Sequence, residues 1–132
     1  MEYPIGNYKY WTVKVFFNQE YLGRCIVNCK REDALDLTDA TLEEREELFL
    51  ILTQLKKAIK KSFDNDWINY SFLGNSYRHL HCHVVPRYQS PKEFEGMTFV
   101  DKRWGYNWLL NEKFETPDNI LEAVKNKIKE NL

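Results

Sequence analysis

Histidine and apolar residues alternate along a short stretch in the second half of the chain. Between residues 79 and 84, the only histidines of the protein interleave with three apolar side chains: His79, Leu80, His81, Cys82, His83 and Val84. Side chains of a strand point alternately to its two faces, whereas a helix would scatter the same residues around its circumference. The alternation therefore predicts a strand that turns three imidazoles to one side and three apolar side chains towards a core.

Other segments also have the composition of β-strands. They are residues 10–17, 22–29 and 67–73. Only four residues separate the first two, which suits a hairpin. Gly74 and Asn75 then turn the chain into the histidine strand, where we expect Pro86 to end regular pairing because it lacks an N–H.

The pattern changes to helical spacing after residue 41. Thr41 and Glu44 form a capping-box pattern, and glutamates crowd the first turns while lysines crowd the last, as the helix dipole favours. The apolar stripe of this helix consists of Leu48, Ile51, Leu52, Leu55 and Ile59. A final helix is predicted to start around residues 116–118, with Pro117 in its first turn. Its buried stripe consists of Ile120, Leu121, Val124 and Ile128.

These elements predict an α+β fold with strands in hairpins, one long central helix and a C-terminal helix. Residues 87–108 are aromatic and polar, and we expect loops there. The chain has 132 residues, of which 43% are apolar, so it is long enough to bury a substantial core. We expect a single domain over residues 1–132.

Composition excludes several classes of partner. The net charge is -1 and no strongly basic block is present, which argues against binding of a nucleic acid duplex. No stretch approaches the roughly 18 apolar residues of a membrane span, and the N-terminus lacks the pattern of a signal peptide. Cys25 and Cys29 lie too far apart along one strand to form a disulfide. We therefore expect a reduced, cytoplasmic protein.

Three interpretations of the imidazole face are open. The histidines could be polar residues on an exposed face, without chemistry. They could bind a metal, because neutral imidazoles suit zinc, although no HExxH motif, CxxC pair or acidic ligand accompanies the strand. They could also act on a phosphate, because a histidine with a pKa of about 6.5 is mostly neutral at pH 7 and its lone pair can attack directly. Flanking imidazoles would then donate to phosphate oxygens.

The surroundings of the motif favour phosphate chemistry. Residues 79–85 fit the pattern His, apolar, His, apolar, His, apolar, apolar, which resembles the histidine triad family of nucleotide hydrolases and transferases. The following Pro86 and Arg87 also recur in its fragile-histidine-triad and dinucleoside polyphosphate hydrolase branches. The resemblance covers residues 10–88, and residues 89–132 form an aromatic C-terminal segment and helix. It implies a mainly antiparallel sheet of about five strands and a homodimer.

The resemblance also assigns roles to the three histidines. His81 is expected to be the nucleophile. His83 would contact the reacting phosphate and assist the leaving group. His79 would belong to the hydrogen-bonded chain that orients the other two.

Further candidates for binding the nucleotide or its phosphates follow from matching positions. They are Asn18, Arg24, Asn75, Ser76 and Arg87. Asn75 and Ser76 match a phosphate-binding pair in which glutamine is usual at the first position. Arg24 stands where many members have a fourth histidine, and it is either a permanent phosphate donor or an ordinary surface arginine. Another frequent histidine is replaced by Glu32.

The expected reaction is hydrolysis of the phosphoanhydride of a dinucleoside polyphosphate, such as diadenosine tetraphosphate, through a covalent nucleotidyl-histidine intermediate. The alternatives are a nucleoside phosphoramidase and a nucleotide-binding regulatory protein with little catalysis. No cofactor and no protein-bound metal are expected, although Mg²⁺ can act on the phosphates of the substrate. Three aromatic residues either cover the ligand or, as we favour, anchor the C-terminal segment: Trp104, Tyr106 and Trp108.

Overall fold

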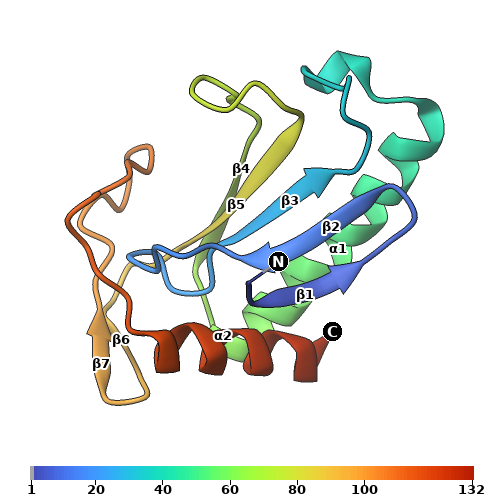
Figure 1. Ribbon diagram of the computed structural model, residues 1–132. Helices are drawn as coiled ribbons and strands as arrows, with labels where there is room; N and C mark the ends of the chain where they lie inside the picture. Colours follow the sequence, from blue (N-terminus) through green and yellow to red (C-terminus); the bar gives the residue numbers. More distant parts are fainter. Residues whose placement is uncertain (1) are drawn as a thin grey trace.

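The computed structural model describes residues 2–132, which form a five-stranded sheet, a short hairpin and two α-helices (Figure 1). The sheet has the order β1-β2-β3-β5-β4, and all neighbouring strands are antiparallel. Its strands are β1 (Pro4–Asn7), β2 (Trp11–Val15), β3 (Cys25–Cys29), β4 (Trp67–Ser71) and β5 (His81–Arg87). The expected α+β fold with a mainly antiparallel sheet of about five strands is therefore confirmed.

The helices pack on one side of the sheet. Helix α1 (Leu42–Phe63) lies behind the sheet in Figure 1, and α2 (Asp118–Asn131) crosses below it and contacts α1, β1 and β2. Both predicted apolar stripes are buried in the core between these layers. The predicted capping box is present, since Thr41 Oγ1 accepts from the Glu44 amide and Glu44 Oε1 accepts from the Thr41 amide. Pro117 is the N-cap of α2 rather than part of its first turn.

Regular pairing does not end at Pro86, so that prediction is wrong. Strand β5 continues to Arg87, and Pro86 is paired with Ile68 of β4. Pairing between β3 and β5 extends only as far as Val84. At Pro86 the strand has a neighbour on one side only, and a proline is tolerated there because one edge needs no N–H donor.

Other elements were not expected. Strand β1 contains Pro4 and Gly6, which disguise it in the sequence, and its pairing with β2 is irregular between these two residues. A hairpin of β6 (Lys92–Phe94) and β7 (Met97–Phe99) lies in the segment predicted to be loop. A 3₁₀ turn, η1 (Leu37–Asp39), precedes α1. No helix within residues 2–132 is long and apolar enough to cross a membrane.

Candidate active site

The histidine motif lies on β5, between β3 and the edge strand β4, on the face of the sheet opposite to the core. Leu80, Cys82 and Val84 are at most 2% exposed and belong to the core, as the alternation predicts. On the other face, His83 pairs with Ile26 of β3 and with Ser71 of β4. His81 and His83 lie within β5, whereas His79 lies just before it. The three imidazoles thus follow one another along the beginning of β5.

The His81 ring is oriented by its own backbone. Its Nδ1 lies 2.5 Å from the carbonyl oxygen of His79. A carbonyl oxygen only accepts, so Nδ1 carries the proton and Nε2 carries the lone pair. This tautomer makes Nε2 the nucleophilic atom of the ring.

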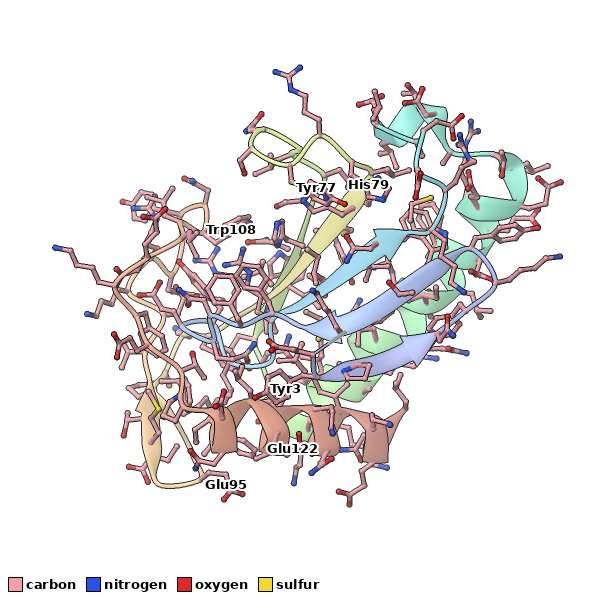
Figure 2. All side chains as sticks on the ribbon, in the orientation of Figure 1. Tyr3, Tyr77, His79, Glu95, Trp108 and Glu122 are labelled. Atoms are coloured by element: carbon pink, nitrogen blue, oxygen red, sulfur yellow. The ribbon has the colours of Figure 1, made fainter. Side chains whose placement is uncertain are left out.

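His79 is tied to the neighbouring strand. Its Nε2 lies 2.6 Å from the carbonyl oxygen of Cys29 at the end of β3, so Nε2 is the protonated nitrogen. The ring of Tyr77 lies 5.4 Å from the rings of both His79 and His81. Figure 2 shows Tyr77 and His79 side by side at the start of β5. His79 therefore fixes the backbone carbonyl that orients the His81 ring.

His83 has the opposite tautomer. Nη2 of Arg24 lies 3.2 Å from its Nδ1, and a guanidinium group only donates, so Nδ1 accepts and Nε2 carries the proton. Burial, together with the neighbouring charge of Arg24 and His81, lowers the pKa of His83 to about 4. His83 is therefore neutral at physiological pH and presents an N–H donor.

Arg24 is a buried residue, not a surface arginine. It precedes β3 and follows Gly23, whose φ of 91° favours glycine. Its guanidinium carbon lies 4.1 Å from the ring centre of Phe16 and 4.3 Å from that of Trp108. Burial lowers the pKa of Arg24 to about 10, so the group keeps its positive charge at neutral pH. Arg24 is thus an enclosed cation that directly contacts the histidine motif.

A cavity of about 350 Å³ opens beside these groups, a size typical of ligand pockets. Its walls are formed by Phe16, Arg24, Ile26, Leu73, Gly74, Asn75, Ser76, Tyr77, His81, His83, Trp108 and Leu110. The structure therefore brings together five of the predicted residues, of which Asn75 and Ser76 are exposed at the rim. Apolar walls with a few convergent polar groups suit a small ligand that has both apolar and polar parts.

Asn18 does not line this cavity. Its side chain is buried, and Nδ2 donates to the carbonyl of Asn111 at 2.8 Å while Oδ1 accepts from the amide of Glu20. The bond to Asn111 attaches the segment before α2 to the turn between β2 and β3, and the bond from Glu20 lies within this turn. In this structure Asn18 holds the scaffold of the site and does not face the cavity.

Arg87 also lies outside the cavity, and its donors are already engaged. Its Nε and Nη2 form a buried ion pair with Asp101, in which the two side chains are 5% and 0% exposed. The remaining bonds go to Asn69 Oδ1 and to the carbonyls of Arg103 and Tyr106. The guanidinium thus has no free N–H, and its bonds join β5 to the residues that follow it.

The C-terminal aromatic residues differ in their roles. Trp108 donates through Nε1 to Ser71 Oγ at 2.9 Å and lies 5.6 Å from the His83 ring, so it is anchored and lines the cavity at once. Figure 2 shows Trp108 on the segment that precedes α2. Tyr106 is 74% exposed and Trp104 is 37% exposed. Of the three aromatic residues, Trp108 is therefore the one that covers the site.

Tyr77 was missed as a site residue because it lies in the turn before β5, where the His79 amide donates to the Tyr77 carbonyl at 2.9 Å and the strand period does not apply. Ser71 was also missed, because its position beside His83 depends on the register between β4 and β5. Within residues 2–132, no group of three or more His, Cys, Asp or Glu side chains is placed to hold a metal ion.

Known proteins resemble this chain in sequence. A family model described as the HIT domain matches residues 23–90. The chain is 29% identical over 94 residues to bis(5'-adenosyl)-triphosphatase from Saccharomyces cerevisiae, in a match that covers 59% of this chain and 46% of the yeast protein. The chain thus spans about half the length of the curated relatives that it matches.

Solved structures share the fold. A histidine triad (HIT) protein from Sinorhizobium meliloti has a TM-score of 0.82 and 22% identity, over 98% of this chain and 89% of that protein. Diadenosine triphosphate hydrolase from Plasmodium falciparum has a TM-score of 0.67 and 14% identity, over 96% of this chain and 74% of that protein. The stretch matched by the family model is just over half of the chain and contains β3, α1, β4 and β5 with its histidines. The chain therefore belongs to the HIT domain family, whose histidine triad it carries at His79, His81 and His83.

Proposed function

We propose that this protein is a nucleotide hydrolase that cleaves the phosphoanhydride of dinucleoside polyphosphates, such as diadenosine tetraphosphate, through a nucleotidyl-His81 intermediate. The proposal depends chiefly on one observation. The bond from Nδ1 of His81 to the His79 carbonyl leaves a lone pair on Nε2, in a ring that lines the cavity. The yeast relative named as a bis(5'-adenosyl)-triphosphatase supports the substrate class.

In the first step, the Nε2 lone pair of His81 attacks the α-phosphorus. A P–N bond forms, the bridging P–O bond breaks, and its electron pair leaves with the oxygen of the departing nucleotide. The His81 ring becomes positively charged, and the bond from Nδ1–H to the His79 carbonyl stabilises that charge. The Nε2–H of His83 donates to a phosphate oxygen, with Asn75 and Ser76 at the rim as further donors.

In the second step, water attacks the same phosphorus. The P–N bond breaks, its electron pair returns to Nε2 of His81, and a nucleoside monophosphate is released. The proton of the attacking water passes to solvent or to the product phosphate. We propose no cofactor for either step, and Mg²⁺ would act by neutralising the phosphates of the substrate.

A substrate panel tests the proposed function. We expect diadenosine triphosphate and tetraphosphate to be cleaved with release of AMP, and adenosine 5'-phosphoramidate to be cleaved more slowly. Chromatography would identify the products, and reaction in ¹⁸O-water should place one label in the phosphate of AMP. The panel is repeated after chelation, with Mg²⁺ or Zn²⁺ restored separately. Preferential cleavage of the phosphoramidate would identify a phosphoramidase. AMP binding without turnover would identify a regulatory protein. Activity that is lost on chelation and restored by Zn²⁺ alone would identify a metal enzyme.

We further propose that the protein forms a homodimer through β4 and α1. Strand β4 is an edge of the sheet within the described chain, and it exposes Trp67 and Tyr70. Beside it lies an apolar groove of about 730 Å³, with Leu37, Leu48, Phe49, Leu52, Tyr70 and Phe72 among its walls. An open edge next to an apolar groove favours pairing with a second copy, since antiparallel pairing of two β4 strands around a twofold axis would cover both.

The dimer proposal predicts the effect of a charge in the groove. In Phe49→Glu a charge replaces a side chain that is 69% exposed. We expect the molecular mass of the protein, measured by light scattering after size exclusion, to fall from that of two chains to that of one. Leu50→Glu is the matched control, because Leu50 is exposed on the same helix but does not line the groove. A wild-type protein that sediments as one chain at tens of micromolar would contradict the proposal.

A further inference from the structure

Arg24 is an unusual buried cation. Its Nε and Nη1 are buried without any hydrogen-bond partner, and within the described chain it forms no ion pair with a carboxylate. Phe16 and Trp108 enclose it, and its polar contact is the bond from Nη2 to Nδ1 of His83. Unsatisfied buried donors are unfavourable for stability, so an arginine in this position needs an explanation other than folding.

We propose that Arg24 is a positioning residue that acts through His83: together with burial it holds this ring neutral, with its proton on Nε2, and thereby restricts the enzyme to leaving groups that depart as anions. This inference rests on the nucleotide hydrolase function proposed above and narrows it to phosphoanhydrides. Arg24 lines the cavity, but it is only 1% exposed and its Nε and Nη1 are buried, so the accessible N–H donor beside it is Nε2 of His83.

The surroundings of His83 carry positive charge or none. Arg24 faces it from the turn before β3, and His81 lies beside it on β5 with the ring centres 5.2 Å apart. The residues facing it from other elements are uncharged: Phe16 after β2, Ile26 on β3, Ser71 on β4 and Trp108 on the C-terminal segment. Glu20 and Tyr21 act on Arg24, where they favour its charged form. Among the described residues, nothing would stabilise an imidazolium at His83.

The charge state of His83 matters because the two candidate substrates need different help. When a phosphoanhydride is cleaved, the P–O electron pair goes to the oxygen of a nucleotide, which is a stable anion and needs only a hydrogen bond. When a phosphoramidate is cleaved, the P–N electron pair goes to nitrogen, which must gain a proton to leave as an amine. An imidazolium can supply that proton and become neutral, whereas a neutral imidazole would have to become an imidazolate.

Nitrogen NMR tests the charge and tautomer of His83 directly. The chain has three histidines, so ¹⁵N-histidine labelling gives three resolvable rings, and His83→Asn identifies the signal. We expect His83 to show a protonated Nε2 and to remain neutral to below pH 5. In Arg24→Met, which removes both charge and donor, the pKa should rise, while burial, the larger cause of its low value, remains. In Arg24→Gln the pKa should also rise, while the amide can still donate to Nδ1 and keep the tautomer.

A specificity ratio tests the consequence. Below pH 6 we expect kcat/KM for diadenosine triphosphate, divided by that for adenosine 5'-phosphoramidate, to fall at least tenfold in both variants. Circular dichroism checks folding, and methionine retains the length of arginine without its unpaired N–H groups. A specificity ratio that is the same in wild type and variants would overturn the inference. So would a wild-type His83 that carries its proton on Nδ1, or one that titrates at the same pH as in Arg24→Met. If neither substrate is cleaved, the proposed function fails, and NMR still decides whether Arg24 positions His83.

Discussion

Replacement of His81 by alanine is expected to lower the turnover of diadenosine triphosphate by about 10⁴-fold or more, because it removes the attacking lone pair. The fold should survive, since the ring lies on the cavity face and its hydrogen bond is to the backbone of His79, not to the core. AMP should still bind, because the apolar walls and His83 remain. Chromatographic rates, circular dichroism and calorimetry with AMP measure these three properties.

The neighbouring Cys82 provides the matched control. It is fully buried on the opposite face of the same strand, so Cys82→Ala should reduce stability while it leaves turnover nearly unchanged. The two variants thus distinguish a loss of catalysis from a loss of core packing at two adjacent residues. Near-normal turnover by a folded His81→Ala protein would show that the nucleophile is another group.

The features that could be predicted from the sequence are those with a local period. The alternation around His81 defines which face of β5 is buried, because a strand repeats every two residues. The capping box at Thr41 and the stripe of α1 are equally local, since each depends on residues three or four positions apart. The triad face, the long helix and strands β2 to β5 therefore follow from short-range patterns, whereas β1 does not.

The features that were missed depend on contacts between distant residues. Arg87 follows the histidine motif directly, but its role is set by Asp101, fourteen positions further on. Arg24 contacts His83 and Trp108, which lie far from it in the sequence, so its burial could not be inferred from the hairpin alone. Pro86 is tolerated in β5 because β3 ends its pairing earlier, which is a property of register.

The buried ion pair between Arg87 and Asp101 leads to the largest expected change in stability. Asp101 accepts from Nε and Nη2 of Arg87 and from the amides of Tyr88 and Arg103, so it joins β5 to the C-terminal segment. Asp101→Ala would leave a buried guanidinium without its counter-charge, and we expect the free energy of unfolding to fall by about 3–5 kcal/mol. Urea denaturation measures this loss.

The same variant should also lower turnover, because the segment that it loosens carries Trp108 over Arg24 and His83. The control is Arg87→Met combined with Asp101→Ala, which removes both charges and should recover much of the lost stability. The double variant would still lack the bonds from Arg87 to the carbonyls of Arg103 and Tyr106, so its turnover should recover less than its stability. A single variant within about 1 kcal/mol of wild type would mean that the ion pair does not hold this segment in place.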